Sequence, residues 1–348
     1  MTRNIEKVSV LAGGMSYTEW EQIEICYAIN EAARSFTLQG TERPGQFRFP
    51  PGTPITITAN GSLILTGYVN QYRPQGDANS HTVTISGRSK SQDFIDNSAV
   101  HDTGNWENKK PDQIAQDLDK FGVGVTAEVD LQQIPYWQLY QGESPWRTVD
   151  RALRAQGATQ MGAADGSIKI TNASVAKTHA GALIEGYNIK QFAGEITDDN
   201  RHSEYTVKGQ QRTEHGTAAI QPYGKIIDGS VGRYRPKIIV HEADTDKSRA
   251  QKRAEHEANR SAGLSIKATI TTQGWRDDGG KIWEANYTIF VQSPILLKLV
   301  QPMLIERVVL RQSNEGSLAT LQLVDPKAYN GKGGGGSGGS SGSDAAWG

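Results

Sequence analysis

The feature that most constrains the fold is a regular alternation of apolar and polar residues near both ends of the chain. Ile55 and Ile57 alternate with threonine before Asn60-Gly61, a pair suited to a two-residue type I′ hairpin turn. Towards the other end, alternate residues of segments 264–270 and 287–291 are apolar. A period of two places apolar side chains on one face of a β-strand. The sequence therefore predicts two antiparallel β units.

Both units are expected to be similar small β-barrel domains, covering residues 1–88 and 186–330. Closing a short antiparallel sheet on itself removes exposed strand edges, so a barrel or sandwich is the natural arrangement. The units also share a pattern, because residues 66–85 resemble residues 306–323, each segment having a polar turn at its centre. Since the identity between these segments is low, an internal duplication and a chance similarity both remain open.

Residues 89–185 follow a different period and are predicted to form an α+β middle domain. One helix is expected to begin at Pro111, where a missing amide hydrogen does no harm, and to end before Gly122. A second helix is expected to follow Ser144, a good N-cap residue, and to end before Gly157. The predicted fold class is therefore mainly β, with a helix-containing domain in the middle.

Two further segments depart from this plan. A helical insertion is predicted in the last β unit, over residues 212–262, and the apolar stripe of its helix consists only of alanine. Alanine buries little surface, so this helix is expected on the surface or against a partner. Residues 331–348 have the Gly/Ser composition of a flexible linker, and we predict a C-terminal extension outside any domain.

Charge and cysteine content exclude several classes of function. The chain has 37 basic and 38 acidic residues, a net charge of −1, whereas a protein that grips phosphate backbones needs a basic excess. Its single cysteine, Cys26, cannot form an intrachain disulfide or a thiolate metal cage. No apolar run reaches the roughly 18 residues of a membrane span, and no signal-peptide pattern precedes the first domain. We expect a chain made in the cytoplasm, without stable membrane insertion.

The sequence contains no recognisable catalytic or metal-binding pattern. The seven histidines lack metal-ligand spacing, and neither a nucleophile elbow nor a phosphate-binding loop occurs. The acidic pairs Asp198-Asp199 and Asp277-Asp278 have the form of a glycosidase pair, but both lie in turn-like contexts where aspartate is ordinary. The sequence therefore predicts no enzyme activity, no cofactor and no metal.

Aromatic residues of the middle domain leave a second possibility open. Trp106, Tyr136, Trp137, Tyr140 and Trp146 are close in sequence and could form a platform on which sugar rings stack. Packing in a core or an interface explains such residues more often, so we favour packing.

The segment Arg233-Tyr234-Arg235-Pro236 has the residue types that anchor protein interfaces. Two guanidinium groups flank a tyrosine, and the proline that follows restricts the backbone. An ion pair between this loop and its own domain is an equally good interpretation.

These residues also carry a resemblance to a known family. The chain resembles the baseplate hub proteins of Mu-like contractile-tailed phages, within a wider family that includes the T-even phage hub and the hub half of type VI secretion spike proteins. The matching segments occur in the same order over about residues 50–325. They are Gly87–Lys90, Asp93–Asp96 with Ala99-Val100, Trp106 with Asn108, Gln113–Ala115, Asp117-Leu118, Ser203–Gly209, Arg233–Pro236 with Ile238-Ile239, and Gly274-Trp275 with Trp283.

What the resemblance implies is a structural hub in the tail baseplate of a virion, assembled in the host cytoplasm. Its members form homotrimers in which two β-barrel domains per chain alternate around a pseudo-sixfold ring. The ring joins the sixfold tail tube, or a tube-end adaptor, to the threefold central spike, contacts other baseplate proteins, and lines a passage that DNA crosses without sequence-specific binding. The two most specific segments supply the predicted subunit interface: Glu204, Tyr205, Arg233, Tyr234, Arg235 and Pro236.

Three questions stay open at this level. The rival function is a cell-wall carbohydrate-binding or hydrolytic module that uses the aromatic residues of the middle domain. The sequence does not distinguish a phage from a tail-derived bacteriocin. The C-terminal extension departs from the family pattern, and a spike or a neighbouring baseplate protein is its expected contact.

Overall fold

The computed structural model describes residues 5–41, 49–78, 81–210, 223–295 and 299–329. The chain is mainly β, with 49% of residues in strands and 16% in helices, as the sequence predicted. The C-terminal extension, residues 331–348, and part of the expected insertion, residues 211–222, lie outside the described residues.

The first β unit has the strand order β3-β4-β7-β6-β5-β1-β2. Asn60 and Gly61 have φ angles of 46° and 81°, so they form the left-handed turn that joins β5 to β6, as predicted. The strands are β1 (Val8–Ala12), β2 (Met15–Tyr17), β3 (Gln22–Ala28), β4 (Ser35–Gly40), β5 (Pro54–Ala59), β6 (Ser62–Gly76) and β7 (His81–Ser89).

The last β unit has the strand order β14-β18-β21-β20, with β19 beside the first half of β20 and β13 parallel to β19. Its strands are β13 (Lys177–Ile184), β14 (Ile189–Ile196), β18 (Ile266–Gln273), β19 (Tyr287–Ser293), β20 (Leu299–Ser313) and β21 (Gly316–Val324).

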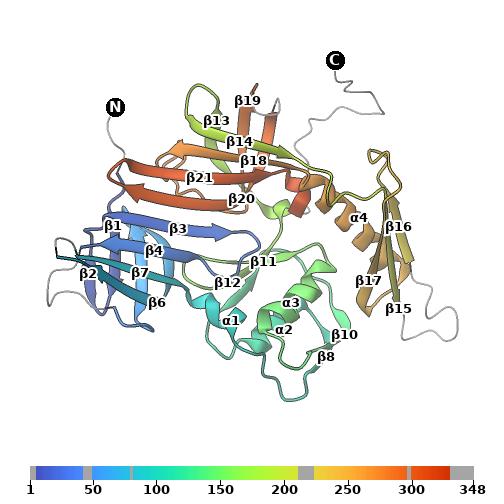
Figure 1. Ribbon diagram of the computed structural model, residues 1–348. Coiled ribbons are helices and arrows are strands. Elements are labelled where there is room, and N and C mark those ends of the chain that lie inside the picture. Colours follow the sequence, from blue (N-terminus) through green and yellow to red (C-terminus); the bar gives the residue numbers. More distant parts are fainter. Residues whose placement is uncertain (1–4, 42–48, 79–80, 211–222, 296–298, 330–348) are drawn as a thin grey trace.

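Strands β3 and β20 join the two units edge to edge. Arg307–Gln312 of β20 pair antiparallel with Ile23–Ala28 of β3, which makes one continuous 13-stranded sheet among the described residues (Figure 1). Within those residues neither unit closes on itself, so the expectation of two closed barrels is not met. The physical reason is that β3 uses its outer edge to pair with the other unit, whereas closure would require that edge within its own unit.

The two units share a register that supports duplication. In the first unit Gln71 pairs with Ser86, and in the last unit Arg307 pairs with Gln322, so residue numbers differ by 236 in both strands. The long strand is irregular at the same place in each unit, between Val69 and Gln71 and between Ile305 and Arg307. The similarity between residues 66–85 and 306–323 therefore reflects this repeat, with the two segments aligned a few residues out of register.

A second local feature repeats at the irregular position of the long strand. Gly52 and Asn286 both have a positive φ, 87° and 58°. Their amides donate to the carbonyl oxygens of Val69 and Ile305, residues 236 positions apart, at 2.7 and 3.0 Å. Two left-handed residues that meet the same irregularity in the long strand are difficult to explain by chance similarity.

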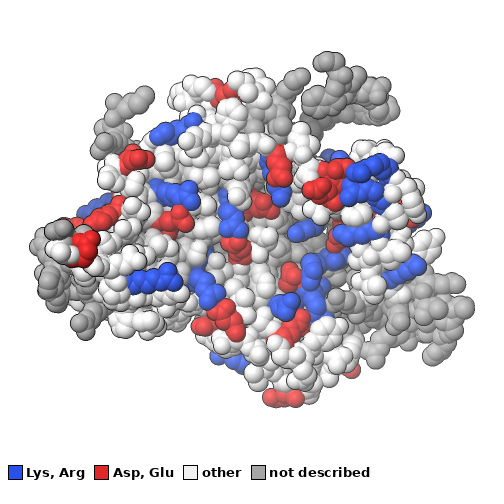
Figure 2. Space-filling model, viewed as in Figure 1, with Lys and Arg blue, Asp and Glu red and all other residues white. Residues whose placement is uncertain are grey.

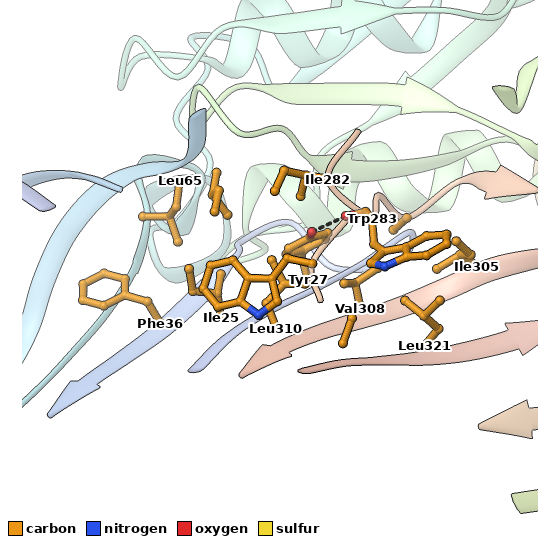
Figure 3. Close-up of a cluster of buried hydrophobic side chains, with 14 of the residues drawn as sticks. Ile25, Tyr27, Phe36, Leu65, Ile282, Trp283, Ile305, Val308, Leu310 and Leu321 are labelled. Atoms are coloured by element: carbon orange, nitrogen blue, oxygen red, sulfur yellow. Dashed lines mark hydrogen bonds between the residues drawn. The ribbon is translucent and has the colours of Figure 1, made fainter. Parts of the chain in front are cut away.

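A shared core lies under the junction of the units. Ile25 and Tyr27 of β3 and Val308 and Leu310 of β20 are each no more than 1% exposed (Figure 3). The Tyr27 hydroxyl donates to the carbonyl oxygen of Trp283, in the loop that precedes β19. Because one hydrophobic cluster spans both units, they pack as one body.

The middle segment packs around a separate hydrophobic cluster. Helix α2 ends at Leu118, earlier than the expected limit of Gly122, because the Asp119 carboxylate accepts hydrogen bonds from the amides of Val123 and Gly124 and so caps the following turn. Ser144 caps α3 as predicted, accepting from the amide of Arg147. The elements are α1 (Asp93–Asp96), β8 (Asn105–Lys109), α2 (Pro111–Leu118), β9 (Val125–Ala127), β10 (Ile134–Gln138), α3 (Pro145–Arg154), β11 (Thr159–Gly162) and β12 (Ile168–Thr171), with 3₁₀ turns at Lys90–Gln92, Ala173–Val175 and Pro326–Tyr329.

The insertion lies between β14 and β18 and begins before the expected residue 212. It contains β15 (Glu204–Gln210), β16 (Tyr223–Ile227), β17 (Pro236–Asp244) and α4 (Lys247–Gly263). The alanine stripe of α4 packs within the chain, since Ala250 and Ala254 are fully buried against Val207, and this corrects the expected surface position. Small residues permit that close packing: a Cβ on Gly224 would lie 2.4 Å from the carbonyl oxygen of Ala250.

Candidate subunit interface

The loop that carries Arg233 and Arg235 is held by the loop that follows β14. Arg233 forms an ion pair with Asp198, Nη2–Oδ2 2.7 Å, and hydrogen bonding from Arg233 holds the pKa of that carboxyl below its usual value. Arg235 donates to the backbone carbonyl oxygens of Asp198 and Asp199, at 2.8 Å each. Both arginines therefore make the contacts within the chain that the sequence left as the alternative.

Neighbouring hydrogen bonds fix the base of the same loop. The Ser203 hydroxyl accepts from the amide of Arg235 at 2.8 Å, and the Ser203 amide donates to the carbonyl oxygen of Arg235 at 3.0 Å. Arg201 and Asp228 form a second ion pair, Nη2–Oδ2 2.7 Å. Burial opposes ionisation of Asp228, but hydrogen bonds from Ser230 and Arg201 lower its pKa below the usual value. The loop is therefore presented in a defined conformation.

The six predicted interface residues do not share one environment. Tyr234 is 81% exposed, and Pro236 is exposed at the start of β17. Glu204 is half-buried and pairs with Lys225, Oε2–Nζ 2.8 Å. Tyr205 is fully buried, and its hydroxyl oxygen accepts from the amide of His202 at 3.0 Å. Tyr205 therefore supports the sheet from inside, while Tyr234 is the residue most available to a neighbouring molecule.

The sequence did not single out three exposed apolar residues on the sheet beside this loop. Helix α4 covers one face of the sheet β16-β15-β17, and the other face carries Ile227, Ile238 and Val240, which are 70%, 63% and 73% exposed. Ile238 and Val240 are neighbours on β17, whereas Ile227 lies on β16, opposite Glu204 of the central strand β15. Exposed β-branched residues that neighbour each other on a strand are unusual unless something covers them. The available signal was the apolar run Ile238-Ile239-Val240, but such a run does not show which of its side chains are covered.

The aromatic residues of the middle domain do not form an exposed platform. Trp106 and Trp137 pair across β8 and β10 and are 4% and 3% exposed. The indole nitrogen of Trp106 donates to Asp117 at 3.1 Å. Arg151 lies over the rings of Trp137 and Tyr140, 4.6 and 4.0 Å from their centroids. Trp106 and Trp137 are packing residues, which is the interpretation that the sequence favoured, whereas Tyr140 is 50% exposed.

The acidic pairs serve turns and buried contacts. Asp198 lies in the loop bound by Arg233, and Asp277 accepts from the amides of Gly279 and Lys281 while its other oxygen lies 2.7 Å from His179 Nδ1. No group of three or more potential metal ligands occurs among the described residues. None of the helices in the described ranges is long and apolar enough to cross a membrane.

Successive parts of the chain match models of one group of phage proteins. Residues 7–89 match the N-terminal model of Mu phage baseplate assembly protein GpP-like, residues 91–172 the second domain of baseplate hub protein gp44-like, and residues 246–332 the fourth domain of Mu phage baseplate assembly protein GpP. The 43 kDa tail protein of prophage MuSo2 from Shewanella oneidensis is 31% identical, with a TM-score of 0.83 over 93% of this chain and 100% of that one. The chain belongs to the Mu phage baseplate hub family.

Other members and relatives agree with this assignment. Baseplate hub protein gp44 of Escherichia phage Mu is 29% identical over 334 residues, covering 92% of this chain and 88% of that protein. The E. coli c3393 protein, a component of the type VI secretion system described as similar to the T4 tail proteins gp27 and gp5, has a TM-score of 0.56 over 90% of this chain and 76% of that one. At 9% identity the latter likeness concerns the fold alone.

The family assignment settles the general role. Its members are structural proteins of the tail baseplate, so the chain is a baseplate hub component of a contractile tail and not an enzyme. The resemblance inferred from the sequence motifs is confirmed.

Proposed function

We propose that three copies of the chain form a ring in which the first and last β units alternate. Six similar units would then face the sixfold tail tube or its end adaptor, while three insertions and middle domains face the threefold central spike. Other baseplate proteins bind the outside of the ring, and DNA passes through its centre.

The observation that carries this proposal is the repeated register of the two units. The strand pairs Gln71–Ser86 and Arg307–Gln322 have the same spacing, and β3 joins one unit to the other edge to edge. Two equivalent units per chain are the simplest way for a closed ring of three chains to present six similar faces.

The loop and face of the insertion are proposed as contacts with neighbouring molecules. Tyr234 and Pro236 would contact them directly, and the ion pair of Arg233 with Asp198 would hold the loop in position. Arg235 and Glu204 would act through the same loop and sheet, and buried Tyr205 would support them from inside. The C-terminal extension, outside the described residues, is proposed to contact a spike or a neighbouring baseplate protein.

The charge distribution suits a passage for DNA. Figure 2 shows acidic and basic side chains interspersed over the viewed face, and the net charge of the chain is −1. Because affinity for phosphate backbones grows with the number of phosphates neutralised, a near-neutral ring would release DNA readily.

The proposal is tested by assembly of the full chain. Light scattering should give a trimer, and immobilised trimer should capture the tail-tube and spike proteins of the same tail. Arg233→Ala and Arg235→Ala should weaken the trimer while circular dichroism and the melting temperature remain close to those of the parent chain; Arg249→Ala, on the insertion but away from the loop, is the matched control. A monomeric parent chain would contradict the trimeric ring. Unchanged assembly in both loop variants would contradict the role of the loop in it.

A further inference from the structure

The two β units differ in how their corresponding edge strands are covered. Glu195 of β14 pairs with Lys267 of β18, just as Cys26 of β3 pairs with Ser35 of β4. Strand β18 then pairs with β21 as β4 pairs with β7, in the register that the repeat requires. Strand β14 is therefore the counterpart of β3. Among the described residues, however, β14 pairs only with β18, and its outer edge is open.

Apolar side chains mark the open edge of β14 as a surface that should be covered. Phe192 and Ile196 occupy the positions of Ile23 and Tyr27 in β3. Ile23 and Tyr27, next to β20, are 3% and 1% exposed, whereas Phe192 and Ile196 are 40% and 59% exposed. The same positions are thus buried where a strand is added and exposed where none is.

The chain also contains the counterpart of the strand that covers β3. Strand β3 pairs with Arg307–Gln312 of β20, and residues 71–76 of β6 are equivalent in the repeat. Strand β5 pairs with β6 only as far as Tyr68, and the amide and carbonyl of Val69 complete that ladder. Within the described residues no strand pairs with the outer edge of β6 beyond this point.

We propose that the outer edge of β14 in one chain pairs antiparallel with residues 71–76 of β6 in a second copy, repeating between chains the β3–β20 junction within each chain. This inference rests on the proposed ring and specifies its subunit contact. Because a different edge is used on each side, the contact is heterologous, and it closes into a ring when the rotation between chains permits.

The repeat fixes the register of the proposed pairing. In the chain, Val309 of β20 lies opposite Cys26 of β3. Their counterparts are Arg73 and Glu195, so these two residues lie opposite each other in the proposed ladder. Neither residue takes part in an ion pair among the described residues. An oppositely charged pair directly across two strands favours this register over its neighbours.

The junction within the chain has the same kind of charge pair. Glu24 of β3 lies opposite Arg311 of β20, and their side chains form an ion pair, Oε2–Nε 2.7 Å. Pro74 lacks an amide hydrogen and would weaken the new ladder by one hydrogen bond, but a proline is compatible with such pairing, since Pro302 lies opposite Phe290 between β20 and β19.

Cysteine cross-linking of the full chain tests the pairing and its register. Directly opposite residues of antiparallel strands have Cα atoms about 4.5–5.5 Å apart, within the range of a disulfide. In a Cys26→Ser background, the double variant Arg73→Cys with Glu195→Cys should give a covalent trimer on a non-reducing gel after mild oxidation. The control, Arg73→Cys with Ala193→Cys, should give at least tenfold less, because its cysteines are two residues out of register.

The outcomes separate this inference from the proposed ring. A covalent trimer that forms only in the matched variant supports the pairing. A trimer by light scattering without that cross-link, or with equal cross-linking in the control, would overturn the pairing and leave the ring intact. A parent chain that remains monomeric at micromolar concentration would overturn both.

Discussion

Arg34 of the first β unit and Glu284 of the last form a buried ion pair, with Nη2 and Oε2 2.7 Å apart. The arginine is 3% exposed, and it also donates to the carbonyl oxygens of Ile64 and of Gly162 in the middle domain. Its guanidinium lies over the ring of Tyr27, 4.2 Å from the centroid. One side chain therefore links three parts of the chain.

Replacing this arginine should strongly destabilise the protein. In Arg34→Ala the carboxylate of Glu284 and two backbone carbonyls lose their donor, and we expect the free energy of unfolding to fall by about 3–5 kcal/mol. Arg311→Ala is the matched control, because its pair with Glu24 is exposed and should cost less than about 1 kcal/mol. Urea unfolding monitored by tryptophan fluorescence measures both; similar losses in the two variants would contradict the linking role.

Gly87 should not tolerate a side chain. A Cβ at this position would lie 2.1 Å from the carbonyl oxygen of Tyr68 and 2.6 Å from the ring of Phe36. We expect Gly87→Ala to lower the free energy of unfolding by about 1–3 kcal/mol through overpacking. Gly229→Ala should have little effect, since no atom lies within 4 Å of its Cβ position. Equal melting temperatures for the two variants would disprove this close approach.

Local patterns predicted the local structure well. The left-handed turn at Asn60-Gly61 and the cap at Ser144 formed as expected, because each depends on residues close in sequence. The expectation of closed barrels was not met, because the sequence does not reveal that β3 pairs with β20, about 280 residues away. Strand pairing over such separations depends on packing and not on local propensity.

The environment of the candidate interface residues also depends on contacts between distant parts of the chain. The arginines and Tyr234 were recognisable as interface residue types, but the burial of Tyr205 was not visible in the sequence. The open edges of β6 and β14 could be identified only after the strand pairs were known, since an edge strand and a central strand share one periodicity.

Trp137→Ala should distinguish a packing role from sugar binding. Removing a buried indole leaves a cavity, and we expect a loss of about 3–5 kcal/mol in the free energy of unfolding. Tyr140→Ala, at a half-exposed ring, should cost much less. Binding of peptidoglycan fragments, measured by calorimetry, should be undetectable in the parent chain and both variants. Saccharide binding by the parent chain that disappears in Tyr140→Ala would instead favour the carbohydrate-binding rival.

His179 should make the stability depend on pH. Its Nε2 accepts from the amide of Glu284 at 3.1 Å, so Nδ1 carries the proton and donates to Asp277 at 2.7 Å. Burial lowers the pKa of His179 below its ordinary value, an effect that Asp277 opposes and nearby Lys281 reinforces. The Asp277 pKa is lowered despite burial, mainly by hydrogen bonding from His179, so this carboxylate stays ionised to lower pH.

The sign of the effect follows from which state binds the proton. As the pH falls below about 6.5, the unfolded chain protonates His179 while the folded chain does not, so the free energy of unfolding should decrease by up to about 1.4 kcal/mol per pH unit. His256, whose pKa burial also lowers, adds a decrease of the same sign. His179→Asn should be less stable at pH 7.5 but show a shallower decrease between pH 7 and 5 in urea unfolding. His81→Asn changes an exposed histidine and is the control: its free energy of unfolding should change with pH as steeply as that of the parent chain. If His179→Asn shows the same steepness, His179 does not cause the pH dependence.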